Sequence, residues 1–185
     1  MLKVIVSCVL ALVVLGLGAR GCGLTPEQIE SEAILAGLNA EEGEAFRSAN
    51  RKLASVIELA GGLQVQVLHL GEGEVPTADD WVVVHFRGKH LDGRVFEDSW
   101  RRGEPATIPL ERAIEGWRRA LLSLPVGSSV RLVIPPSLAY GRVGAGAVGP
   151  EETLVFDLAL LAIAEAPAQP ERDPAQQAVP GLGPN

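Results

Sequence analysis

Apolar and polar residues follow three different patterns along the chain. Residues 4–17 are almost all apolar and follow a short start that carries Lys3. Between residues 46 and 60, apolar side chains recur at three- and four-residue spacing, which is the period of an amphipathic helix. From residue 63 onward the period changes to two, as in a β-strand. The chain therefore begins with an apolar leader, continues with a helical segment and ends in a β-rich domain.

The helical segment, residues 22–62, has two predicted helix starts. Thr25 and Gln28 are placed as an N-cap and the third residue of a capping box. Asn39 and Glu42 repeat this pattern before the apolar stripe that ends near residue 60. The stripe is compatible with a helix packed on the following domain and equally with a dimerisation arm.

Four strands and one helix are predicted in the β-rich domain, residues 63–165. The strands correspond to the runs LQVQVLHL, WVVVHFRG, SVRLVIP and TLVFDLALLAI. An Asp-Gly pair after the second run matches the twist of a hairpin turn. Ile114, Trp117 and Leu121 recur at helical spacing between residues 110 and 124 and predict a short helix whose indole points inward. The expected fold class is α+β, an antiparallel sheet folded over one helix.

The first 21 residues have the composition of an export signal. Small residues at Ala19 and Gly21 precede Cys22, and the apolar run is shorter than the about 20 residues that span a bilayer. A cysteine at the cleavage site is typical of a bacterial lipoprotein, with lipid attached to Cys22. Because Arg20 departs from the usual lipobox, cleavage to an unmodified periplasmic protein also stays open. Gly23 lacks the aspartate associated with inner-membrane retention, which favours the outer membrane for a lipidated form.

Net charge and proline content restrict the classes of partner and the extent of the folded domain. Removal of residues 1–21 takes away two basic residues, Lys3 and Arg20, and no acidic ones, so the formal net charge changes from −7 to −9. Nucleic acid is an unsuitable partner for a chain whose few basic residues are dispersed among acids. Residues 166–185 are rich in proline and poor in large apolar groups, which predicts a disordered tail.

The polar residues indicate no nucleophilic triad and no metal site. Ser99 and Ser123 have no histidine at a recognisable motif spacing. His85 and His90 lie five residues apart, which places them on opposite faces of an extended strand. They share no ligand pattern with cysteine or carboxylate, so we interpret them as structural or solvent-facing groups and expect no metal or cofactor.

A glycine-rich stretch after Tyr140 contains a formal G-x-G-x-x-G at Gly144, Gly146 and Gly149. A dinucleotide loop requires a strand before this motif and a helix after it, because the helix N-terminus binds the phosphate. Here two prolines precede the motif and a β-rich run follows it. The motif therefore has the spacing of a nucleotide loop without its context, and a linker between strands is compatible with the stretch.

Five of the eight aromatic residues fall at the ends of predicted elements or at inward strand positions, where a buried core is the ordinary explanation. The segments around them, GKHLDGRVFEDS, AIEGW, LPVGSSVRLVIPPSLAYG and ETLVFDLALL, resemble the FKBP-type peptidyl-prolyl cis–trans isomerases in order and spacing across residues 64–163. The preceding amphipathic helix resembles the exported macrophage-infectivity-potentiator branch of that family. Members of that branch often dimerise through N-terminal helices.

This resemblance implies a half-barrel sheet wrapped on the short helix, with an apolar cleft whose floor is Trp117. It implies that Tyr140 offers its phenol to a substrate carbonyl, and that the glycine-rich loop lies over the cleft with Val148 as its cap. The implied catalytic residues are Tyr140, Glu97, Phe96 and Trp117. The implied substrate-binding residues are Phe86, Asp98, Ile108, Ala113, Ile114, Val148 and Phe156. Proline-containing polypeptides and macrolide inhibitors are the implied ligands, and a homodimer is the implied assembly.

Several residues depart from the family pattern. Phe86 stands where the family usually has a tyrosine, and Glu97 stands where an aspartate is usual, with Asp98 adjacent. Ala106 and Ile108 occupy positions that are often aromatic. Because catalysis by orientation is sensitive to small displacements, these departures predict reduced or altered isomerase activity.

Three hypotheses about function follow. The first is an exported isomerase that assists folding of envelope or secreted proteins. Rotation about an X-Pro amide has a barrier of about 18–20 kcal/mol without any bond being broken, so a site that binds the twisted amide more tightly than the planar one is sufficient. The second is a non-catalytic proline-binding or chaperone module on the same fold. The third is a structural envelope lipoprotein that associates through its helix.

Overall fold

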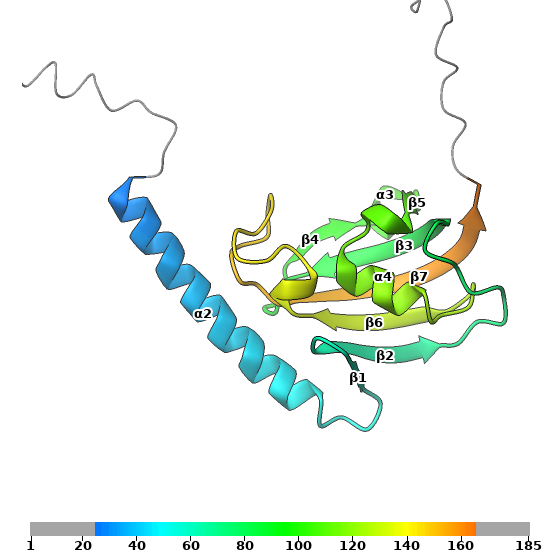
Figure 1. The fold of residues 1–185 in the computed structure, drawn as a ribbon, viewed down its shortest axis with the longest axis horizontal. Helices are drawn as coiled ribbons and strands as arrows, with labels where there is room; N and C mark the ends of the chain where they lie inside the picture. Colours follow the sequence, from blue (N-terminus) through cyan, green and yellow to red (C-terminus); the bar gives the residue numbers. More distant parts are fainter. Residues whose placement is uncertain (1–24, 166–185) are drawn as a thin grey trace, which may run out of the picture.

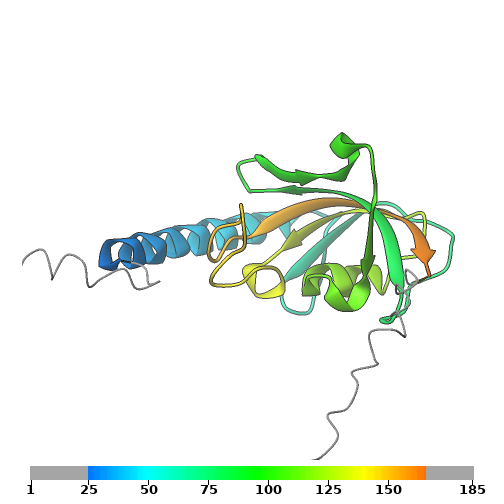
Figure 2. The ribbon, with the colours of Figure 1, turned by 90° about the horizontal axis from the view of Figure 1, so that it is seen from above.

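The computed structural model describes residues 25–165, which form one long helix and a curved sheet around a short helix (Figures 1 and 2). The predicted leader, Cys22 and the predicted tail lie outside the described residues. In chain order the elements are α2 (Pro26–Asn50), β1 (Ile57–Leu59), β2 (Leu63–His69), β3 (Trp81–Lys89), β4 (Val95–Asp98), α3 (Ser99–Arg102), β5 (Ala106–Pro109), η1 (Leu110–Arg112), α4 (Glu115–Leu121), β6 (Ser129–Ile134), η2 (Pro136–Leu138) and β7 (Leu154–Ala164). Within the described range, no helix is both long enough and apolar enough to cross a bilayer.

The strands form one antiparallel sheet in the order β1-β2-β6-β7-β3-β4, and β5 pairs with β3 beyond this path. The fold class is therefore α+β, as the sequence predicts. All four predicted strands are confirmed, and the Asp-Gly turn joins β3 to β4. The three strands that sequence analysis missed have only three or four residues each.

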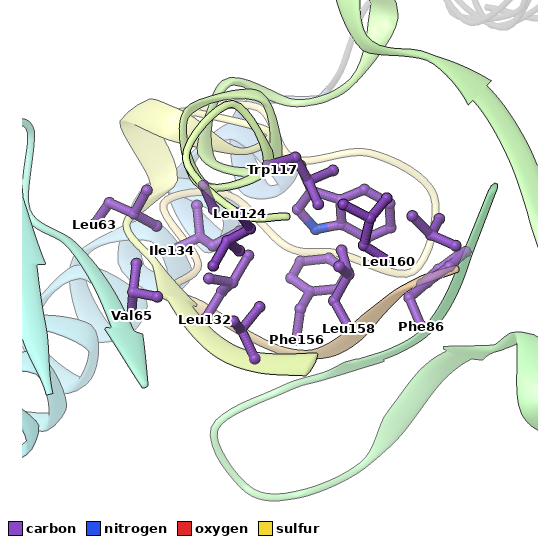
Figure 3. Packing of buried hydrophobic residues seen from close by; sticks show 14 of the residues in the cluster. Leu63, Val65, Phe86, Trp117, Leu124, Leu132, Ile134, Phe156, Leu158 and Leu160 are labelled. Atoms are coloured by element: carbon purple, nitrogen blue, oxygen red, sulfur yellow. The ribbon is translucent and has the colours of Figure 1, made fainter. Parts of the chain in front are cut away.

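The core lies between α4 and the sheet (Figure 3). Burial alternates along β3 and β7, so every second side chain of these strands faces α4. The buried face of α4 carries Gly116, Trp117, Ala120 and Leu121. A Cβ on Gly116 would lie 2.5 Å from Ile134 Cγ2, which shows how closely the helix approaches the sheet. Only glycine at this position allows that approach.

The short helix is shorter than its predicted range of 110–124. Residues Leu110–Arg112 form the separate 3₁₀ turn η1, and α4 begins after Ile114. Ala113 and Ile114 are extended, with ψ values of 153° and 146°, so the helical path is interrupted between the two elements. The predicted inward direction of Trp117 is confirmed, since its side chain is only 5% exposed.

The long helix α2 is continuous from Pro26 to Asn50. The predicted capping box at Thr25 is confirmed, because its hydroxyl accepts from Gln28 N and its own N–H donates to Gln28 Oε1. The second predicted start, at Asn39, is wrong. Asn39 lies inside the helix, and its side-chain amide donates to Pro150 O instead. The helix also ends before residue 60, because residues 57–59 pair with β2 as strand β1.

A polar stripe, rather than the predicted apolar one, docks α2 on the domain. Asn39, Gly43, Arg47 and Asn50 follow helical spacing and share one face. Gly43 is the buried residue of the helix, Arg47 donates to Thr153 Oγ1, and Asn50 donates to Gln64 Oε1 at 2.8 Å. The hypothesis that the helix packs on the domain is thus confirmed, and side-chain hydrogen bonds take part in the contact.

The two glycines of α2 give a matched test of this docking. A Cβ on Gly43 would lie 2.3 Å from Thr153 Oγ1, whereas a Cβ on Gly37 meets nothing within 4 Å. Gly37→Ala should stabilise the helix by up to about 1 kcal/mol through propensity alone. Gly43→Ala should push the helix off the domain and lower the hydrogen-exchange protection of residues 26–50. Equal protection of the helix in the two variants would contradict this account of the docking.

Candidate active site

An open cavity of about 350 Å³ lies beside α4 and has a mainly apolar wall. This volume is within the usual range for small-ligand sites. Strands β3, β4, β5 and β7 contribute to the wall together with α4 and the segments that precede and follow it. The lining residues are Phe86, Glu97, Ala106, Ile108, Arg112, Ala113, Ile114, Trp117, Tyr140 and Phe156. Eight of the eleven residues predicted for the cleft are among them.

Three aromatic rings, those of Phe86, Trp117 and Phe156, line the cavity, and we call them its floor. Figure 3 shows the same rings packed together in the core. The Trp117 indole meets Phe86 edge-on, with ring centroids 4.8 Å apart, and meets Phe156 in the same way at 5.2 Å. Edge-to-face contacts of this kind favour a fixed orientation of the rings. The floor is therefore rigid and apolar, although it belongs to the core on one side and to an open cavity on the other.

The indole nitrogen of Trp117 is an unusual feature of this floor. Among the described residues, Nε1 is the only buried side-chain nitrogen or oxygen without a hydrogen-bond partner. Leaving a buried donor unpaired costs about 1–3 kcal/mol. Buried polar groups without a partner are expected mainly at functional sites. The unpaired Nε1 donor is therefore consistent with a binding role for the indole.

Tyr140 supplies a phenol at the rim of the cavity. It follows η2 and is 37% exposed. Burial raises the pKa of the Tyr140 phenol above its ordinary value, and the negative charge of Glu97 raises it further. The hydroxyl is therefore protonated at physiological pH and able to donate a hydrogen bond.

Charged side chains lie at the rim rather than on the floor. Glu97 accepts a hydrogen bond from Arg102 Nη1 at 3.2 Å, and both side chains are about half exposed. The Arg102 guanidinium also lies 6.0 Å from the Phe86 ring centroid. Arg112 lines the cavity too, and sequence reasoning missed it. Its position directly before Ala113, a predicted lining residue, was the signal that could have found it.

Three of the predicted residues lie off the cavity wall. Phe96 packs edge-on against Phe156 from the side, with centroids 5.7 Å apart, and lines a neighbouring depression together with Asp98. The Asp98 carboxylate caps α3 by accepting from Arg101 N, and it pairs with Arg87. Val148 is 7% exposed and packs in the core. Their roles toward a substrate stay predictions.

A serine and a histidine do meet in the structure, although their sequence spacing gives no motif. Ser99 Oγ lies 2.9 Å from His85 Nδ1, but the serine is fully buried. The same oxygen accepts from Phe86 N at 2.8 Å and donates to Phe86 O. The hydroxyl thus joins α3 to β3 and is not accessible as a nucleophile. The described range also contains no cluster of three His, Cys, Asp or Glu able to hold a metal.

The glycine-rich segment is a loop and not a nucleotide site. It follows η2 and leads into β7 without an intervening helix. Gly144 and Gly146 have positive φ values of 73° and 57°, and Gly149 N donates to Glu152 Oε2 at 2.7 Å. The sequence-based rejection of a dinucleotide loop is confirmed.

Comparisons with known proteins all indicate the same family. A family model described as FKBP-type peptidyl-prolyl cis-trans isomerase matches residues 72–161. The chain is 44% identical over 126 residues to the peptidyl-prolyl cis-trans isomerase Mip of Coxiella burnetii, covering 68% of this chain and 55% of that protein. It is 38% identical over 129 residues to the outer membrane protein MIP of Legionella longbeachae, covering 69% and 55%. The chain therefore spans about half the length of these curated relatives.

A solved structure covers more of the chain. The crystal structure of FkpA from Escherichia coli superposes with a TM-score of 0.72 at 33% identity, covering 87% of this chain and 83% of that one. The coverage extends beyond the range matched by the family model. The similarity therefore includes much of the fold outside the isomerase motifs.

Tyr140 is the only tyrosine of the chain, so its titration can be followed without interference. Absorbance near 295 nm should show a single phenol with a midpoint above pH 10, because burial and Glu97 both disfavour the phenolate. Glu97→Gln removes the nearby charge and should lower the midpoint. A midpoint at or below pH 10 in the folded protein would contradict the described placement of the phenol.

Proposed function

The chain belongs to the FKBP-type peptidyl-prolyl cis–trans isomerases, in the branch that includes Mip and FkpA, and on this premise we propose that it is an isomerase of X-Pro peptide bonds. Its proposed role is to assist the folding of envelope or secreted proteins. The observation that carries the proposal is the cavity itself, in which a packed aromatic floor lies next to a neutral phenol. We also propose macrolide inhibitors as ligands of the same cavity.

The proposed mechanism requires no covalent step. A pyrrolidine ring enters the cavity and packs on the Trp117 indole, which places the preceding amide near the rim. As the amide twists, it loses the resonance that keeps it planar. The Tyr140 hydroxyl donates to a substrate carbonyl in this geometry, and the apolar wall excludes the water that would compete for it.

Rate acceleration then depends on binding the twisted amide more tightly than the planar one. Each tenfold gain in rate needs about 1.36 kcal/mol of such differential binding. A hydrogen bond from a preoriented phenol and contacts with a rigid floor are interactions of suitable strength. Phe86 in place of a tyrosine removes a phenol from the floor, and Glu97 in place of an aspartate puts a longer carboxylate at the rim. We therefore still predict reduced or altered isomerase activity.

A non-catalytic module on the same fold is the less supported alternative. Its support comes from Phe86 and Glu97 alone. The named relatives include an isomerase, and Trp117, Phe156 and Tyr140 of this chain line the cavity.

We further propose a division of the chain into a leader (1–21), a helical arm (22–62), an isomerase domain (63–165) and a tail (166–185). The arm is proposed to form a homodimer. Ile34 and Leu38 of α2 support this, because they are 58% and 60% exposed and lie away from the docking stripe. An apolar helical face of this kind is suited to pairing with a second helix.

The envelope of a bacterial cell is the proposed location. The similarity to an outer membrane protein MIP supports it, and the leader with Cys22 supports a lipid anchor. Mass spectrometry of the mature N-terminus should find an acylated Cys22. An unmodified terminus at another residue would exclude the anchor and leave a periplasmic protein.

The catalytic proposal is tested with a protease-coupled assay on a peptide of the Ala-Leu-Pro-Phe type. The protein should accelerate cis-to-trans conversion at micromolar concentration. Trp117→Ala should lower kcat/KM at least about tenfold by removing the floor, and Tyr140→Phe should lower it several-fold by removing the donor.

Trp100→Ala is the matched control for the loss of an indole. Trp100 is 40% exposed, stacks on His85 and does not line the cavity, so its removal should leave the rate close to that of the unchanged protein. Folded Trp117→Ala and Tyr140→Phe variants with unchanged kcat/KM would refute the assignment of the site.

A further inference from the structure

One peptide group connects the long helix to the cavity rim. The amide between Pro150 and Glu151 is hydrogen-bonded at both ends. Its oxygen, Pro150 O, accepts from Asn39 Nδ2 of α2 at 2.8 Å. Its nitrogen, Glu151 N, donates to Gly141 O at 3.0 Å. Gly141 directly follows Tyr140, so a helix more than a hundred residues earlier in the chain is linked to the residue beside the phenol.

The same peptide group sits in a strained stretch of backbone. Glu151 has a φ of 53° and is the only non-glycine residue with a positive φ in the described range. This left-handed conformation costs roughly 1–2 kcal/mol for a residue with a Cβ. Such strain persists only where surrounding contacts hold it, and it is concentrated at functional sites. The two hydrogen bonds of the amide are contacts of this kind.

Neighbouring contacts fix the stretch on both sides of the amide. Glu152 accepts from Gly149 N with one oxygen, and its other oxygen pairs with His90. Thr153 contacts α2 through the Arg47 guanidinium. Asn39 therefore belongs to the contact that docks α2 on the domain, and this contact holds the end of the glycine-rich loop before β7.

We propose that Asn39 is a positioning residue for Tyr140 and acts through the Pro150–Glu151 amide. This inference rests on the proposed isomerase function, to which it adds a role for the helical arm. A hydrogen bond at the oxygen of an amide polarises the group and strengthens the donation by its nitrogen. Loss of the Asn39 donor weakens the hold on Gly141 and lets the phenol move from its place. A displacement of this kind lowers the rate without altering the floor.

The test compares two truncations on the same helix. Asn39→Ala removes the donor to Pro150, whereas Asn50→Ala removes the hydrogen bond to Gln64 on β2 and leaves the loop untouched. Asn39→Ala should lower kcat/KM about three- to tenfold, mainly through kcat, because the pyrrolidine still packs on Trp117. Asn50→Ala should stay within twofold of the unchanged protein.

A double-mutant cycle identifies the group through which Asn39 acts. In a Tyr140→Phe background, Asn39→Ala should lower the rate by less than twofold, since the donor it positions is already absent. An equal loss in both backgrounds would overturn the proposal. So would an equal loss in Asn50→Ala, or no loss in a folded Asn39→Ala protein.

Hydrogen exchange separates failure of this inference from failure of the proposed function. Absence of isomerase activity in the protein without substitutions would refute the proposed isomerase function. Exchange of the Glu151 amide should still be faster in Asn39→Ala than in Asn50→Ala, because its bond to Gly141 O is weakened. Identical exchange rates at Glu151 in the two variants would overturn the coupling, whatever the activity.

Discussion

The close approach of α4 to the sheet is the constraint on which the site depends. Gly116 allows it, because any Cβ there would collide with Ile134. At this separation the Trp117 indole fits edge-on against Phe86 and Phe156 and still lines an open cavity. One aromatic cluster thus closes the core and forms the floor of the cavity. A rigid floor is what a mechanism based on differential binding requires, because stabilisation of a twisted amide depends on geometry that does not relax.

Most of the fold could be predicted from periodicity, and the errors have physical causes. Long strands such as β3 and β7 show clear alternation, whereas β1, β4 and β5 are too short for a period to be visible. The predicted stripe continues past residue 50 because Leu53 and Val56 in the turn after α2, and Ile57 of β1, fall in phase with it by chance. Asn39 has the side chain of a helix cap, but a capping residue and a tertiary hydrogen-bond donor look the same in a sequence. Only the position of Pro150 in space distinguishes them.

The site was predicted from motifs, which give the order of residues but not the direction of side chains. On β4, burial alternates so that Phe96 and Asp98 share one face while Glu97 lies on the other, toward the cavity. Arg112 was missed because no motif includes it, although it lies between two cavity segments. The link from Asn39 to the loop was beyond sequence reasoning for another reason. It joins backbone atoms and a side chain separated by 111 residues, with no residue pattern that marks the partner.

The central claim is that the aromatic cavity accelerates rotation about a prolyl amide by binding alone, without proton transfer or nucleophilic attack. The most direct test is the solvent isotope effect on kcat/KM, measured with a prolyl peptide between pH 6 and pH 9. Catalysis by binding predicts a ratio of rates in H₂O and D₂O close to unity and a rate that is flat across this range. A large isotope effect, or a rate that follows the titration of a single group, would contradict the account.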